Sequence, residues 1–118
     1  MIGLNLACRG DEILRLEDRA KAPANGQKRS ELIDQIVSIV NTEIIDAGRL
    51  SYGLRALYGL GVPKERLIEM AEHYNDRMRF VAHQLSPHPT QIPHIHFFYV
   101  QEDGGYEKIE VNNAGHPS

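Results

Sequence analysis

The sequence predicts an α+β fold, in which a long antiparallel helical hairpin packs with a small antiparallel sheet. Three observations support this prediction. Apolar residues recur at helical spacing from residue 30 to residue 86. A Gly-Pro-containing turn at residues 59–63 divides this stretch into two arms. A glycine-rich turn then separates two short alternating segments within residues 94–111. With 118 residues, the chain is long enough for one domain with its own core.

The first arm of the predicted hairpin is a helix from Ser30, a suitable N-cap residue, to Tyr58. Gly48 and Gly53 each cost about 1 kcal/mol relative to alanine in a helix, so a kink or break near 48–53 is an alternative. The second arm begins after Pro63, which suits the first turn of a helix. In both arms the apolar residues alternate spacings of four and three, as in a heptad repeat. The resulting seam includes Ile33, Val37, Val40, Ile44, Leu67, Tyr74, Met78 and Val81.

This seam is longer than one intrachain hairpin needs. We therefore expect a second copy of the chain to pack on it, which makes the protein a homodimer, the commonest symmetric assembly. The alternative is that the seam faces the protein's own sheet. A second apolar stripe beside it, formed by Leu32, Ile36 and Ile39, indicates that the first arm packs on more than one neighbour.

The N-terminal part of the chain has weaker patterns. Residues 2–7 alternate apolar side chains and are predicted to form a short strand, a candidate third strand of the sheet. Residues 11–22 are predicted to form a helix, although charged residues alternating with two leucines would also allow a strand. Residues 23–28 are rich in turn residues and are predicted to form a loop. The single cysteine, Cys8, is expected to be a small buried side chain.

The C-terminal part predicts a β-hairpin. Residues 86–93 contain three prolines and are expected to form an extended connector. Residues 94–101 and 106–111 are the predicted strands, and residues 102–105 (EDGG) supply the positive φ angles of a tight turn. Residues 112–118 are expected to form a loose tail.

Charge and composition restrict the expected partners and compartment. The net charge of −3 disfavours nucleic acid as the main partner. No apolar run approaches the length of a membrane span. A single cysteine excludes an intrachain disulfide and favours a reducing compartment. We therefore expect a cytoplasmic protein.

His94 and His96 are the most prominent candidate metal ligands. Residues two apart in a strand point to the same side. That side would also carry Phe98, so we expect both histidines to lie on the packed face and to be structural. A zinc site would need at least three protein ligands, and the nearest further histidines are His83 and His88.

A group of acidic residues offers an alternative, catalytic interpretation. The group comprises Glu43, Asp46, Glu69, Glu72 and Asp76. Carboxylates on facing helices can hold Mg²⁺ for phosphate chemistry. The spacing distantly resembles the paired carboxylates of the all-α nucleotide pyrophosphohydrolases, but these pairs differ from the family's, and its double glutamate is absent. We do not assign the family, and we expect solvated helix faces paired with nearby arginines.

Residues 54–70 also allow a helix-turn-helix interpretation. A DNA-recognition helix carries basic and amide groups at its start, whereas Glu65 and Glu69 occur in this one. No phosphate-binding glycine loop and no nucleophile motif is present in the sequence. The leading prediction is therefore a dimeric module that binds a protein or a small ligand, without catalytic chemistry or a cofactor. Mg²⁺-dependent nucleotide hydrolysis is the first alternative, and DNA binding is the second.

Overall fold

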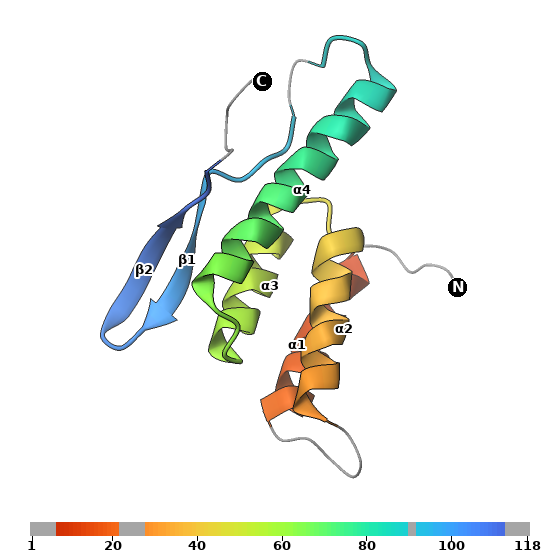
Figure 1. Cartoon of the computed structure of the whole chain (residues 1–118). Coiled ribbons are helices and arrows are strands. Elements are labelled where there is room, and N and C mark those ends of the chain that lie inside the picture. The colour runs from red at the N-terminus through yellow and green to blue at the C-terminus, as the bar shows by residue number, and fades with distance from the viewer. Residues whose placement is uncertain (1–6, 22–27, 90–91, 113–118) are drawn as a thin grey trace.

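Figure 1 shows the computed structural model of the chain, which describes residues 7–21, 28–89 and 92–112. These residues form four helices and a two-stranded antiparallel sheet, which confirms the α+β class. The elements are α1 (Ala7–Lys21), α2 (Arg29–Thr42), α3 (Ala47–Gly59), α4 (Lys64–Leu85), β1 (Phe97–Glu102) and β2 (Gly105–Glu110). The predicted strand at residues 2–7 falls outside the described residues except for Ala7, which begins α1.

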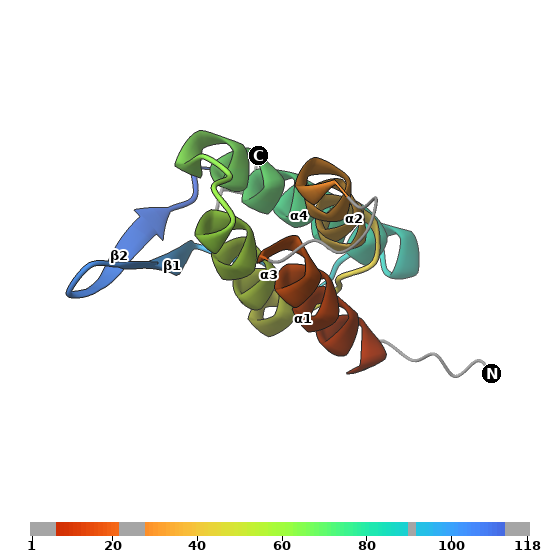
Figure 2. The same cartoon turned by 90° about the horizontal axis from the view of Figure 1, so that it is seen from below.

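The helices run alternately in opposite directions, and α3 lies between the hairpin and α1 (Figures 1 and 2). Helix α3 contacts α1, α2, α4 and β1, so it is the central element of the fold. One continuous apolar core receives side chains from all six elements. Its largest fully buried members include Ile13, Leu16, Leu32, Ile36, Leu50, Leu54, Leu57, Leu67, Tyr74 and Phe98.

The prediction of one unbroken helix from Ser30 to Tyr58 is wrong. Helix α2 ends at Thr42, and α3 begins at Ala47. The chain turns at residues 43–46, before the two glycines that the sequence suggested as a break. Asp46 supplies the physical reason, because its carboxylate is the N-cap of α3 and accepts a hydrogen bond of 2.9 Å from the backbone N–H of Arg49. Its second oxygen forms an ion pair of 2.5 Å with the Arg49 guanidinium.

This break changes the role of the predicted seam. Val40, Ile44, Leu67, Tyr74 and Met78 are buried within the single chain. Ile33 and Val37 are only partly buried, whereas the flanking residues Leu32, Ile36 and Ile39 form the packed face of α2. Val81 is exposed. Most of the seam is therefore intrachain core, and only its C-terminal end is uncovered.

Helix α1 and the β-hairpin are close to their predictions. The predicted helix at residues 11–22 is confirmed over residues 11–21 as part of α1, which begins earlier in the chain, and residue 22 lies outside the described residues. The predicted turn is also confirmed, since Glu102 pairs with Gly105, and Gly104 and Gly105 both have positive φ. Strand β1 begins at Phe97 rather than at His94. Of the predicted loop at 23–28 and tail at 112–118, only Lys28 and Asn112 are described.

Gly53 allows α3 to approach α2 closely. A Cβ atom at this position would lie 2.8 Å from Cγ2 of Val40, a distance that side chains do not tolerate without movement. Val40 is buried and its β-branched side chain has few alternative rotamers. The helix-breaking tendency of this glycine is therefore offset by the packing that it permits.

We expect Gly53→Ala to lower the free energy of unfolding by about 1 kcal/mol, because overpacking outweighs the gain in helix propensity. Thermal unfolding followed by circular dichroism measures this change. Gly59→Ala is the matched control in the same helix, because a Cβ atom there meets nothing within 4 Å. A Gly53→Ala protein that melts at or above the wild-type temperature would contradict the proposed close contact.

Candidate functional site

The C-terminal half of α4 carries the most prominent uncovered apolar surface. Its last turns extend beyond the ends of α2 and α3 (Figure 1). Phe80, Val81 and Leu85 are 65%, 42% and 83% exposed, and Ile45 in the α2–α3 connection is 48% exposed. Ile45, Val81 and Leu85 line one groove, and we call these three residues the α4 face. Phe80 lies about 140° from Leu85 around the helix axis and does not line this groove. Exposed apolar side chains gathered at one groove commonly mark an interaction site.

A groove of about 770 Å³ adjoins the α4 face. Met78, Val81, Ala82 and Leu85 form its helical wall, and Ile45 and two prolines of the following connector, Pro89 and Pro93, also line it. The volume falls in the range of small-molecule and peptide sites. The lining is mainly apolar, so hydrophobic contact would supply most of the binding free energy of an occupant.

Arg77 provides the cation of this groove. Its guanidinium donates a hydrogen bond of 2.6 Å to the backbone carbonyl of Ile44 and lies 5.7 Å from the centre of the Tyr74 ring. Burial lowers the pKa of Arg77 from its ordinary value. Burial also raises the pKa of Tyr74 to about 12. Arg77 thus holds the α2–α3 corner against α4, which shapes the groove.

The acidic residues singled out from the sequence are distributed over different parts of the fold. Glu43 and Asp46 lie in the α2–α3 connection, whereas Glu69, Glu72 and Asp76 lie along α4. Asp76 forms an ion pair of 2.6 Å with Arg79. Glu69 lies beside a small cavity of about 240 Å³ that Arg66 and His73 also line. Among the described residues, no group of three or more His, Cys, Asp or Glu side chains could hold a metal ion.

Asp46 has a structural role at the start of α3. Burial alone would raise the pKa of Asp46, but the hydrogen bonds and the positive charge of Arg49 outweigh burial and lower it. The carboxylate is thus kept ionised by the arginine that it caps. This arrangement is typical of a helix N-cap.

The two histidines do not occupy the packed face that the strand pattern predicted. His96 is exposed and His94 is half-buried, because regular strand structure begins only at Phe97 and Ile95 takes the buried position instead. Nδ1 of His94 donates a hydrogen bond of 2.6 Å to the carbonyl of Ile92. The two imidazole rings are in edge contact, with centroids 4.5 Å apart.

The helix-turn-helix interpretation corresponds to α3, the turn at residues 60–63 and the start of α4. Gly61 adopts a φ of 100° in this turn, which favours glycine. The side chain of Lys64, in the first turn of α4, is held by carboxylates of the hairpin. The start of this helix therefore packs with the sheet.

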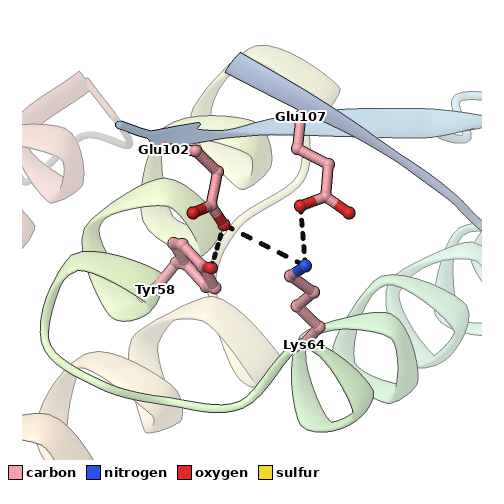
Figure 3. Close-up of polar contacts among 4 residues, drawn as sticks. All are labelled: Tyr58, Lys64, Glu102 and Glu107. Atoms are coloured by element: carbon pink, nitrogen blue, oxygen red, sulfur yellow. Dashed lines mark hydrogen bonds and ion pairs between the residues drawn. The ribbon is translucent and has the colours of Figure 1, made fainter. Parts of the chain in front are cut away.

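Four polar side chains join the hairpin to the helices (Figure 3). Tyr58, near the end of α3, donates a hydrogen bond from its hydroxyl to Glu102 of β1. Nζ of Lys64 lies 2.6 Å from Oε1 of Glu107 and 4.0 Å from Oε2 of Glu102. The ammonium group of Lys64 and the hydroxyl of Tyr58 thus contact the carboxylates of Glu102 and Glu107 at the turn end of the sheet.

The contacts in this cluster raise the pKa values of Tyr58 and Lys64. The hydrogen bond to Glu102 is the main cause that raises the pKa of Tyr58, and the hydrogen bond to Glu107 is the main cause that raises the pKa of Lys64. Both groups thus keep their protons in the folded state at a pH where the unfolded chain loses them. Their contribution to stability is present below their ordinary pKa values, 10.0 and 10.5, and is lost as the pH rises through the raised values.

We expect Tyr58→Phe to lower the melting temperature at neutral pH and to make its decline above pH 10 less steep than in the wild type. Melting curves at a series of alkaline pH values measure this difference. Tyr99→Phe is the control, because Tyr99 lies outside this four-residue cluster. The contact would be refuted by identical pH profiles for the wild type and Tyr58→Phe.

Comparisons with known proteins give no family for this chain: no family model, no curated protein and no solved structure matches it. Of the helices that the structure describes, none has the length and apolar character needed to cross a membrane.

The sequence prediction missed several residues of these surfaces. Asn75 was overlooked, although its spacing from Ala71 and Met78 places it on the buried arc of α4. The contacts of Tyr58 and Lys64 with the hairpin join residues more than 40 positions apart. No local pattern predicts such contacts.

Proposed function

We propose that the protein is a self-associating interaction module, whose homodimer forms through the α4 face. The single observation that carries this proposal is the clustering of exposed apolar side chains. Of the eight large apolar side chains that are exposed in the described part of the chain, three belong to the α4 face and line one groove.

The spacing of these residues supports a second copy as the occupant. Leu67, Tyr74 and Met78 are buried within the chain, and the same four-three spacing continues to Val81 and Leu85, which are exposed. The apolar face of α4 therefore extends beyond the part that the other helices of the same chain cover. A second α4, related by a two-fold axis, would continue the same helix packing.

The groove beside the α4 face makes the surface self-complementary. A two-fold interface uses the same patch on both subunits, so it needs both a protruding group and a receiving surface on one chain. Leu85 is the protruding group, since its side chain is 83% exposed at the end of the groove. In the proposed dimer, Leu85 of each copy packs in the groove of the other.

We expect Leu85→Glu to convert the dimer to a folded monomer. Burying one leucine contributes about 1.5–3 kcal/mol, and two-fold symmetry counts it twice, so association should weaken by at least about a hundredfold. Leu85 is 83% exposed in the single chain, so the fold itself should keep its melting temperature at low protein concentration. Met78→Glu is less informative, because Met78 is buried and its replacement would also unfold the chain.

Sedimentation equilibrium over a range of concentrations provides the measurement. The wild type should approach twice the chain mass of 13.3 kDa, and Leu85→Glu should remain at the single mass. Leu14→Glu is the matched control, because Leu14 is a similarly exposed apolar residue on α1, 46% exposed. A wild type that stays monomeric at high concentration, or a Leu85→Glu protein that still dimerises, would overturn the proposal.

A further inference from the structure

A third cavity, of about 400 Å³, is lined by the ends of elements that lie at the opposite end of the molecule from the α4 face (Figure 1). The last turns of α1 and α3 and the turn end of the hairpin meet around it. The volume is within the range of small-molecule sites, about 300–1,000 Å³. Unlike the groove of the α4 face, this cavity is lined by aromatic and charged side chains.

Three of the chain's five tyrosines line this cavity: Tyr52 and Tyr58 from α3, and Tyr106 from β2. The hydroxyl of Tyr58 is engaged by Glu102, which fixes the position of the ring. Tyr106 is 66% exposed, although aromatic rings of this size normally bury much of their surface. Aromatic rings provide flat apolar faces on which a planar group can stack.

The charges of the cavity favour an anionic group. Lys21 is neutralised by Glu17, with Nζ 3.4 Å from the carboxylate. Arg55 lines the cavity, and among the described residues it has no hydrogen-bond or ion-pair partner. Within the part of the chain that the structure describes, its guanidinium is therefore a cation without a compensating carboxylate. Guanidinium groups bind carboxylates and phosphates through two parallel hydrogen bonds.

The side-chain amide of Gln101 completes the polar lining. Gln101 is paired with Tyr106 across the hairpin, so the two side chains project from the same face of the sheet. An amide can both donate and accept hydrogen bonds. The described lining of the cavity therefore combines flat aromatic surface, the guanidinium of Arg55 and one amide.

We propose that this cavity binds a small molecule that has a planar ring and one anionic group, either a carboxylate or a phosphate. The anionic group pairs with Arg55, the ring lies against the tyrosines, and Gln101 bonds to a polar atom of the ring. This site uses none of the residues of the α4 face, so its occupancy and the dimer can be tested separately.

Amide NMR spectra and calorimetric titration of the full chain test the proposal, with four probes. Benzoate represents a free aromatic acid, and adenosine monophosphate represents a ring that bears a phosphate. Inorganic phosphate carries an anionic group without a ring. Benzylamine carries a ring with a cationic group and no anionic group. We expect saturable shifts at Arg55, Gln101 and Tyr106 with benzoate or the nucleotide, and the tighter of the two identifies the source of the anionic group.

Benzylamine should produce no saturable shifts, and inorganic phosphate should bind at least about tenfold more weakly, because it lacks the ring that the tyrosines contact. Equal binding of inorganic phosphate and both ring-bearing probes would overturn the proposal by reducing the site to a general anion site. The proposal would also be overturned if neither ring-bearing probe bound saturably to the folded wild type.

Two variants test the assigned roles. Arg55→Gln should weaken binding of the ring-bearing anion by at least about tenfold, because the charge-assisted hydrogen bonds are lost. Tyr106→Leu should weaken it as well, while leaving the weak affinity for inorganic phosphate unchanged. Arg19→Gln is the matched control, since Arg19 is an exposed arginine of α1 that does not line the cavity. Equal affinities of wild type and Arg55→Gln, both folded by circular dichroism, would contradict the site.

Discussion

A buried amide fixes the start of the hairpin to the middle of α4, in addition to the polar contacts at its turn end. Nδ2 of Asn75 donates a hydrogen bond of 3.0 Å to the carbonyl of Ile95, and the N–H of Ile95 donates one of 2.8 Å to Oδ1 of Asn75. Asn75 is fully buried, and it is the only buried polar residue in the part of the chain that the structure describes. A two-stranded sheet is marginally stable by itself. The hairpin therefore depends on this attachment and on the packing that follows from it.

The position of both candidate surfaces follows from this attachment. With Ile95 fixed to the middle of α4, β1 runs toward the start of that helix and β2 returns (Figure 1). At the turn end, Tyr58 and Lys64 hold the carboxylates of the hairpin (Figure 3). The tyrosine-lined cavity forms at this end. The C-terminal half of α4 lies on the other side of Asn75, where the hairpin does not reach. Its apolar side chains consequently remain exposed, as the proposed dimer requires.

The sequence predicted the elements whose signals are local. The glycines at 104 and 105 identified the hairpin turn, and the four-three spacing identified the helices. The end of α2 could not be predicted in this way, because Ile44 and Ala47 keep the apolar spacing through the break. That corner depends on Arg77, which is more than 30 positions away and donates to the carbonyl of Ile44. The candidate site was predicted only where Val81 and Leu85 continue the seam.

The most direct test of this account is the exchange rate of the Ile95 amide hydrogen in the wild type and in Asn75→Leu. We expect the wild-type amide to be strongly protected. Asn75→Leu leaves both backbone groups of Ile95 unpaired, so the free energy of unfolding should fall by about 2–5 kcal/mol. Protection should be lost across the hairpin before it is lost in α1–α3. An unprotected Ile95 amide in the wild type, or equal protection of the hairpin in both proteins, would contradict the account.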